Sequence, residues 1–293
     1  MSWRRWFPFA ALLASVTVLF HRLLLGEVIF WGVPLLQFYP WRSLAFDAFR
    51  MGRLPLWNPL VGNGAPLLAN YQTAVFYPPN WLHLLIPDEH AMGWVGLLHV
   101  VWAGLGLAAY LHRLEVDPLG RGVGALSFAL SGFIVARFGF LTTVATAAWL
   151  PWLMWAVDGV ISPMGQPANR AAALAGVSAM LLLAGHAQMA FYSLGMAAAW
   201  AVWRVLSSRA AYTTRIRFLA VALGAVVLGA ALAAVQLAPT FELVRHSQRA
   251  GGVEYRAALS YSFWPWHFLT FLMPGAFGNP ASGDYWGYGA YWE

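Results

Sequence analysis

The chain contains no cysteine and no lysine, and few of its residues carry a charge. All 17 basic residues are arginine, and charged residues make up 10% of the 293 positions, whereas 60% are hydrophobic. Without cysteine, neither a disulfide nor a thiolate metal site can form, and nothing indicates the redox compartment. About a quarter of the residues of a soluble globular protein are charged. The composition therefore excludes a soluble globule and requires lipid.

Long apolar runs follow one another along the sequence and are separated by short polar breaks. Crossing a bilayer takes about 20 apolar residues, a length that recurs along the chain. We therefore predict an all-α polytopic membrane protein with about seven transmembrane helices and a long first extracytoplasmic loop. The expected helices are 6–25, 91–112, 122–137, 142–160, 171–185, 188–206 and 218–238.

Two unusually long apolar runs must each fold as a hairpin. Residues 122–161 would form about 60 Å of helix at 1.5 Å per residue, against a bilayer core of about 30 Å. Two crossings fit this length, with the turn near residues 137–143. The run 171–206 behaves in the same way and should bend at 185–188. Pro239 is expected to end the last helix.

The arginines predict the orientation. Arg4 and Arg5 hold the start of the first helix in the cytoplasm, because basic residues are enriched in cytoplasmic segments. Nine arginines fall at predicted cytoplasmic ends, whereas the two tight outer bends contain only Arg137. Topology therefore accounts for the net charge of +6 better than a nucleic-acid partner does. Residues 26–90 and 240–293 are expected on the extracytoplasmic side.

The first outer loop, residues 26–90, collects polar side chains among Trp, Tyr, Pro and Gly. An amphipathic helix is predicted over 42–52, with its apolar side chains directed to the membrane or to the helix ends. Its water-facing side would carry Arg42, Asp47, Arg50 and Arg53. Residues 55–66 contain too much proline and glycine for helix or strand and should form a turn-built loop. A second interfacial segment is expected at 76–87.

Two acidic residues on this face are candidate bases. Asp47 lies among arginines, which either keep its carboxylate ionised or neutralise it in an ion pair. A solvated surface pair with Arg50 is as good an account of Asp47 as catalysis. Glu27 follows the first helix, and its alternative role is to cap that helix at the membrane edge.

Several sequence blocks together resemble the YfhO-like bacterial membrane proteins. These blocks are QFYPWR from residue 37, GRLPLWNPLVGNGAPLLANYQTAVFYPPNWL from 52, FALSGFIVARFG from 128 and GHAQMAFYS from 185, with FGNP and YWE near the end. That family looks like the GT-C class of polytopic glycosyltransferases. Its members are longer, so this chain is expected to be the N-terminal part of a longer protein.

The resemblance implies a membrane glycosyltransferase of the bacterial plasma membrane. It would transfer a sugar from a polyprenyl-phosphate carrier to a cell-envelope glycopolymer outside the membrane, in contact with membrane lipid. No cofactor is expected, although a divalent ion between acids and a phosphate stays an alternative. The competing function is a non-catalytic flippase or transporter of lipid-linked sugars, or an accessory protein of envelope assembly. A transporter should carry ionisable groups near the bilayer midplane, where this chain has little besides His99.

Sugar transfer defines the site that we expect. The reaction needs a general base and groups that hold the leaving phosphate, and arginine and amide side chains suit phosphate and sugar hydroxyls. Many relatives place an Asp shortly before the QFYPWR block, where this chain has Val33 and Pro34. We therefore expect the base to be Asp47 or Glu27. The expected phosphate contacts are Arg42, Arg137 and Arg245, and the expected sugar contacts are Gln37, Asn63, Asn70, Gln72, His186 and Gln188.

The expected contacts at the two outer bends rest on their setting. An arginine in an otherwise apolar hairpin is costly unless it faces a polar cavity or a partner, which favours a site role for Arg137. His186 and Gln188 lie at a helix bend, where polar side chains also commonly satisfy free backbone groups. Arg42, Arg50 and Arg53 have lipid headgroups as alternative partners.

Overall fold

The computed structural model describes residues 3–161, 166–248, 250–252, 254–259 and 262–287. The chain divides into two compact units, Met1–Leu243 and Val244–Glu293, each of which is considered by itself. Within the described residues, the strands are limited to β1 (Trp57–Asn58) and β2 (Ala65–Pro66), which pair antiparallel. Nearly all other regular structure is helical. The predicted all-α architecture is confirmed, while the loop 55–66 does contain this one short strand pair.

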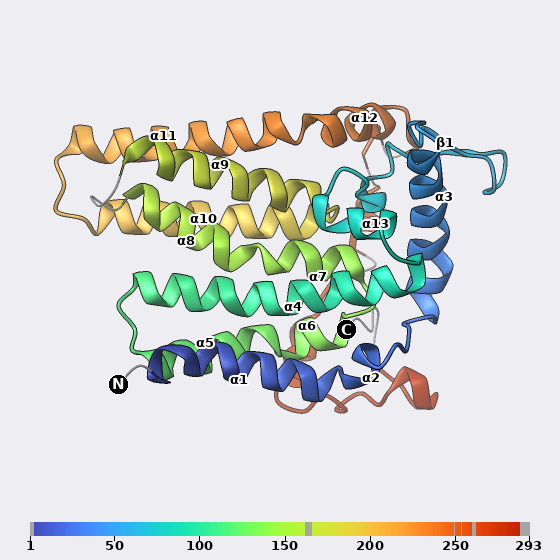
Figure 1. Ribbon diagram of the computed structural model, residues 1–293, viewed down its shortest axis with the longest axis horizontal. Helices are drawn as coiled ribbons and strands as arrows, with labels where there is room; N and C mark the ends of the chain where they lie inside the picture. Colours follow the sequence, from blue (N-terminus) through green and yellow to red (C-terminus); the bar gives the residue numbers. More distant parts are fainter. Residues whose placement is uncertain (1–2, 162–165, 249, 253, 260–261, 288–293) are drawn as a thin grey trace. The chain divides into compact units, whose positions relative to one another are not determined.

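Five helical segments of the described chain are long and apolar enough to cross a membrane (Figure 1). They are α4 (Asp88–Arg113), α5 with α6 (Pro118–Ala129 and Gly132–Ala136), α7 with α8 (Leu141–Ala148 and Leu150–Ile161), α10 (Ala187–Leu206) and α11 (Tyr212–Leu232). Two shorter apolar helices are Pro8–Leu19, within α1 (Trp3–Leu19), and α9 (Pro167–Leu183). The short α2 (His21–Leu24) follows α1. These lengths and compositions suggest association with a membrane.

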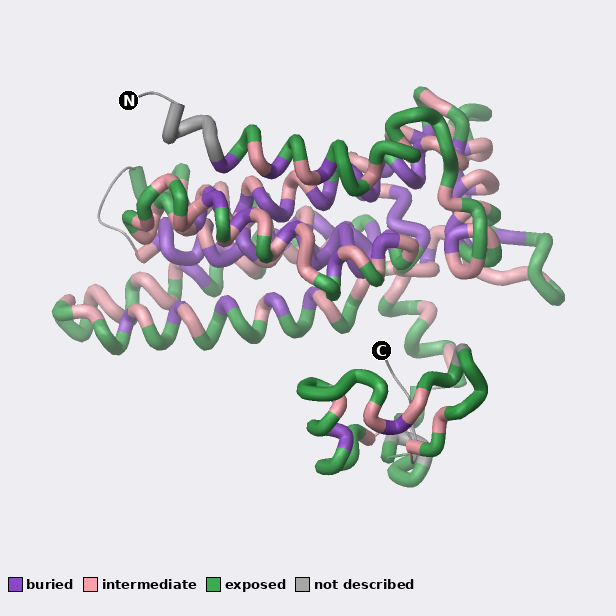
Figure 2. Tube along the Cα trace, turned by 90° about the horizontal axis from the view of Figure 1, so that it is seen from below, coloured by how far each residue is buried: buried purple, intermediate pink, exposed green. Residues whose placement is uncertain are grey.

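The first unit is a helical bundle, and its buried residues lie on the inner sides of the helices (Figure 2). Leu153 of α8 and both Leu174 and Leu181 of α9 have no exposed surface. Glycines allow neighbouring helices to approach closely, because a Cβ at Gly229 of α11 would lie 2.6 Å from the carbonyl oxygen of Ala175 on α9. Such small residues are typical of helix contacts within membranes.

The two predicted hairpin bends fall where the sequence places them. α6 ends at Ala136 and α7 begins at Leu141, whereas α9 ends at Leu183 and α10 begins at Ala187. In the second bend Gly185 has a positive φ of 92°, and a Cβ there would lie 2.9 Å from the Tyr71 carbonyl oxygen. His186 then caps α10, because its Nδ1 accepts a hydrogen bond of 3.2 Å from the Met189 N–H.

Pro239 does not end a helix. α11 stops at Leu232, and α12 (Ala234–Arg245) continues through Pro239. Contacts on both sides of the proline hold α12 against the first loop, since Gln236 Nε2 donates to the Leu68 carbonyl (2.8 Å) and Thr240 Oγ1 to the Ala69 carbonyl (3.0 Å). These tertiary hydrogen bonds hold the helix on both sides of the proline, which itself removes one backbone bond.

A second group of charged residues lies at the end of α4 that is farther from the first loop. The Arg204 Nε lies 2.8 Å from the buried Asp158 Oδ1, and Arg113 Nη1 donates to the Trp155 carbonyl (2.9 Å). Arg170 Nη1 donates to the Gly159 carbonyl (3.2 Å). Arginines therefore close the bundle at the end that the sequence predicts to be cytoplasmic.

The second unit, Val244–Glu293, is built from turns. Within its described residues it contains α13 (Tyr255–Leu259) and the 3₁₀ turns η4 (Pro265–Phe271) and η5 (Pro280–Ser282). His267 is buried among aromatic rings that include Phe263 and Phe277. The described part contains no helix of spanning length, in agreement with the sequence.

Candidate functional site

The first loop forms a folded cap, which we define as residues 33–87. It consists of η1, a single π-helical turn (Pro34–Phe38), then α3 (Tyr39–Arg50), the β1–β2 pair, and the 3₁₀ turns η2 (Tyr71–Thr73) and η3 (Pro78–Leu84). Gly52, with a φ of 69°, turns the chain after α3. Both α3 and η3 pack on α4.

Tyr77 anchors the cap to the helices. His99 of α4 donates from Nδ1 to the Val95 carbonyl (2.6 Å), which leaves Nε2 to accept from the Tyr77 hydroxyl (2.5 Å). The same hydroxyl accepts from Trp149 Nε1 (2.6 Å). Tyr71 donates to the Leu182 carbonyl beside the second bend. Because these groups are buried or half-buried, their hydrogen bonds fix where the cap sits on the bundle.

Arg42 points into the protein, contrary to the water-facing position predicted for it. It is 1% exposed, and its guanidinium carbon lies 5.4 Å from the centre of the Phe38 ring. Phe38, Arg42 and Phe46 are spaced by four residues and therefore share one helical face. Phe38 packs against Met92 of α4, and Phe46 stacks on His83. The packing of Phe38 and Phe46 therefore places Arg42 in the interior.

The Arg42 guanidinium is a buried charge with unused donors. Its Nε and Nη1 atoms have no hydrogen-bond partner among the described residues. Burial lowers the pKa of Arg42 to about 10, so the group still carries its charge at neutral pH. A buried charge without a partner costs free energy, because the interior does not replace the water that it loses. The N–H bonds of these two nitrogens suit an anion.

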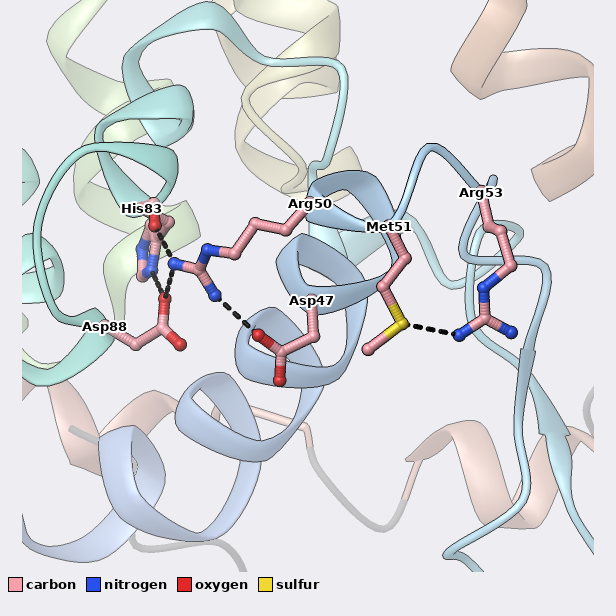
Figure 3. A network of polar contacts seen from close by, with 6 residues as sticks. All are labelled: Asp47, Arg50, Met51, Arg53, His83 and Asp88. Atoms are coloured by element: carbon pink, nitrogen blue, oxygen red, sulfur yellow. Dashed lines mark hydrogen bonds and ion pairs between the residues drawn. The ribbon is translucent and has the colours of Figure 1, made fainter.

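A second buried polar pair lies beside α3, between His83 of η3 and Asp88 at the start of α4 (Figure 3). His83 Nδ1 donates to Asp88 Oδ1 at 2.8 Å, and the ring stacks on Phe46 with 5.0 Å between centroids. Burial lowers the pKa of His83 to about 4, although the hydrogen bond to Asp88 opposes that shift. The imidazole is therefore neutral at pH 7, with its proton on Nδ1.

Arg50 connects this pair to the surface. Its Nη2 donates to the His83 carbonyl and lies 3.8 Å from Asp88 Oδ1, while its Nη1 donates to Asp47 Oδ1 at 2.6 Å. Figure 3 shows the guanidinium between the two carboxylates. Asp47 therefore forms the partly exposed ion pair with Arg50 that the sequence left as the alternative to catalysis.

An apolar cavity of about 370 Å³ lies beneath the cap. It is lined by Tyr77, Pro79, Leu98, His99, Trp102, Trp149 and Met180. Leu98 is 53% exposed on the outer surface of α4, so the cavity reaches the face that would meet lipid. Since the polar atoms of Tyr77 and His99 already bond to each other, the wall is suited to a hydrocarbon chain.

The other predicted site residues lie at or near the surface. Glu27 is exposed and forms an ion pair with Arg22, whose Nε lies 2.8 Å from Glu27 Oε1. Gln37, Asn63 and Gln72 are exposed, whereas Asn70 is half-buried. The Asn70 side chain accepts from the Gln72 N–H at 3.2 Å and so begins η2.

The residues of the two bends share an electrostatic interaction. Burial lowers the pKa of His186, and the positive charge of Arg137 contributes to that lowering. The Arg137 guanidinium also lies 4.9 Å from the centre of the Phe133 ring. Gln188 is exposed and donates to the Tyr192 hydroxyl at 2.9 Å. Arg245 ends α12 in the second unit and is not placed relative to the cap.

Sequence reasoning missed His83 and Tyr77 as site residues. The sequence did offer one signal, because His83 precedes by five residues the acidic start of an apolar helix. That spacing is too common to identify a pair by itself. Tyr77 stands in an aromatic-rich stretch where only the fold distinguishes it from its neighbours.

No family model matches the chain, and no curated protein or solved structure matches it either. The likeness to the YfhO-like proteins therefore rests on the sequence blocks alone. Within the described residues, no three His, Cys, Asp or Glu side chains lie close enough together to hold a metal ion.

Proposed function

We propose that the protein is a GT-C-like membrane glycosyltransferase. It transfers a sugar from a polyprenyl-phosphate carrier to a cell-envelope glycopolymer on the outer face of a bacterial plasma membrane. The observation that carries this proposal is Arg42, a fully buried cation in the cap whose Nε and Nη1 atoms have no hydrogen-bond partner among the described residues. A phosphate oxygen is a strong acceptor for such donors, and binding it compensates the buried charge.

The cavity beneath the cap supports a lipid-linked phosphate rather than a free one. Tyr77 forms part of the cavity wall and directly precedes η3, which packs against α3, the helix that carries Arg42. The proposed anion site and the apolar cavity therefore lie in packed elements of the same cap. A ligand with a hydrocarbon chain and a phosphate head would fill both at once.

The arginines at the opposite end of the bundle support an outward-facing cap. Arg113, Arg170 and Arg204 all lie at the end of the bundle away from the cap, as expected for cytoplasmic ends. The exposed Gln37, Asn63, Gln72 and Gln188, with Asn70, Arg137 and His186, are proposed to contact the sugar and its phosphate.

A reconstituted transfer reaction tests this function. The full chain is placed in liposomes that contain a labelled polyprenyl-phosphate sugar, and an acceptor polymer is added outside. Removing a donor to a developing negative charge typically costs about 10²–10³ in rate, so Arg42→Gln should lose at least that factor. Arg53→Gln is the matched control, since Arg53 is exposed on the same cap. Movement of the sugar between leaflets without transfer would instead indicate a flippase, and neither activity would indicate an accessory protein.

A further inference from the structure

His83 differs from the other buried histidine near the cap in how its ring nitrogens are used. In His99 both nitrogens are bonded, Nδ1 to the Val95 carbonyl and Nε2 to the Tyr77 hydroxyl. In His83 only Nδ1 is bonded, and Nε2 is buried without a partner among the described residues. A buried polar atom without a partner is costly, and the cost requires a reason. A structural role for His83 would not require the unused nitrogen.

We propose that the His83–Asp88 pair accepts the proton of the acceptor hydroxyl during sugar transfer. This inference rests on the proposed function and assigns its base. The Asp88 carboxylate holds Nδ1–H, which fixes the tautomer and leaves the lone pair of Nε2 free to take a proton. α3 and η3 pack together and on α4, so this nitrogen and the unpaired Nε and Nη1 atoms of Arg42 belong to the same cap.

The proton transfer completes a balanced displacement. The oxygen of the acceptor hydroxyl forms a bond to the sugar C1, while the bond from C1 to the phosphate oxygen breaks. The electron pair of that bond leaves on the polyprenyl phosphate, which Arg42 holds. The hydroxyl proton passes to His83 Nε2, and the imidazolium that forms is stabilised by Asp88. Water then removes this proton, which restores the neutral ring.

The charges around His83 favour this role once substrate is bound. They come from Asp88 on α4 and from Arg42 and Arg50 on α3, with Asp47 on α3 paired to Arg50. In the unliganded protein, burial and the two arginines keep the imidazole neutral and therefore able to accept a proton. A phosphate on Arg42 would cancel one of these positive charges and make His83 more basic when the substrate is present.

The two carboxylates predicted from the sequence are less suited to this step. Asp47 and Glu27 are each paired with an arginine at the surface, so their carboxylate oxygens already have partners. The His83 ring has no exposed surface, so the proposal requires the side chains around it to move when the acceptor binds. Arg50 is the exposed side chain that contacts both His83 and Asp88, and it marks the side of approach.

Chemical rescue tests the proposal in the liposome assay with the full chain. His83→Ala should lower the transfer rate by about 10²–10⁴, the usual contribution of a general base. Added imidazole should restore part of the rate, whereas 1,2,4-triazole, which has nearly the same shape but is a much weaker base, should not. Asp88→Asn keeps an oxygen that can accept from Nδ1–H, and it should also slow transfer. The matched controls are His21→Ala and Asp117→Asn, both exposed and far from the pair in sequence.

The outcomes separate this inference from the proposed function. If the wild-type protein transfers no sugar, the proposed function fails, and the assignment of the base fails with it. If the wild type transfers sugar and His83→Ala does so at an unchanged rate, only the assignment of His83 is overturned. Equal rescue by imidazole and triazole would show that His83 merely fills space. Absence of rescue in a variant that unfolds at the wild-type temperature would also overturn the proposal.

Discussion

Replacing Arg42 by methionine should make the unliganded protein more stable while abolishing phosphate binding. The pKa of Arg42 is about 10 instead of 12.5, and a tenfold change in a protonation equilibrium is worth about 1.4 kcal/mol. Burying the charged group therefore costs about 3 kcal/mol. Methionine fills much of the same volume without a charge, and replacing buried ionic groups by apolar ones often stabilises by about 1–4 kcal/mol. We expect a gain of about 1–3 kcal/mol after the loss of packing against Phe38.

Thermal unfolding of the purified protein in detergent measures this gain. Each kcal/mol should raise the unfolding midpoint by roughly 2–4 °C for a chain of this size. Arg53→Met serves as control and should change stability by less than about 0.5 kcal/mol, because Arg53 is exposed. A short-chain polyprenyl phosphate at 100 times its Kd should stabilise the wild type by about 2.7 kcal/mol and leave Arg42→Met unchanged.

Two results would contradict this prediction. If Arg42→Met unfolds well below the wild type, the guanidinium is held by favourable contacts and is not an uncompensated charge. If the variant is stabilised by the polyprenyl phosphate as much as the wild type, the phosphate binds elsewhere. Both measurements need only folded protein and are independent of the transfer assay.

Three further predictions concern the packing of the cap and its titration. Tyr77→Phe should leave two buried groups, His99 Nε2 and Trp149 Nε1, without a partner, at a cost of about 1–3 kcal/mol each in the free energy of unfolding. Thermal unfolding measures this loss against the exposed control Tyr212→Phe. Gly185→Ala should lower the free energy of unfolding by about 1–3 kcal/mol, because φ at this position is positive and the new Cβ meets backbone atoms. The control Gly176→Ala, which has open space around it in the middle of α9, should be neutral or slightly stabilising. Burial lowers the pKa of His83 from 6.5 to about 4, so its neutral ring contributes fully to stability above pH 6.5, and this contribution is lost as the pH falls from 6.5 through 4. His83→Gln should therefore flatten the dependence of the unfolding free energy on pH across that range. An unchanged slope would show that burial of His83 does not disfavour its protonation.

The helices could be predicted because their signals are local. Apolar length and hairpin arithmetic place the bends at 137–143 and 185–188, which overlap the observed gaps between helices at 137–140 and 184–186. The end of the last helix could not be predicted in this way. The contacts of Gln236 and Thr240 with the first loop keep α12 helical through Pro239, and such contacts have no trace in the local sequence.

The sequence predicts the region of the candidate site but not which of its residues contact one another. The polar loop and Arg42 follow from composition, yet the burial of Arg42 follows from its position in the helical repeat. Arg42 lies four residues after Phe38 and four before Phe46, which places its side chain on the buried face of the helix although the side chain is hydrophilic. The pairing of His83 with Asp88 depends on how η3 meets α4, which local patterns do not encode.

The distance between the guanidinium of Arg42 and a bound phosphate decides whether Arg42 forms a phosphate site. Solid-state NMR of the full chain with ¹⁵N-labelled arginine and a short-chain polyprenyl phosphate detects coupling between ¹⁵N and ³¹P. We predict strong coupling in the wild type, as for an N–H···O contact of about 2.8 Å, which is sharply reduced in Arg42→Gln and kept in Arg53→Gln. Coupling of equal strength in Arg42→Gln, or none in the wild type at saturating ligand, would contradict a phosphate site at Arg42.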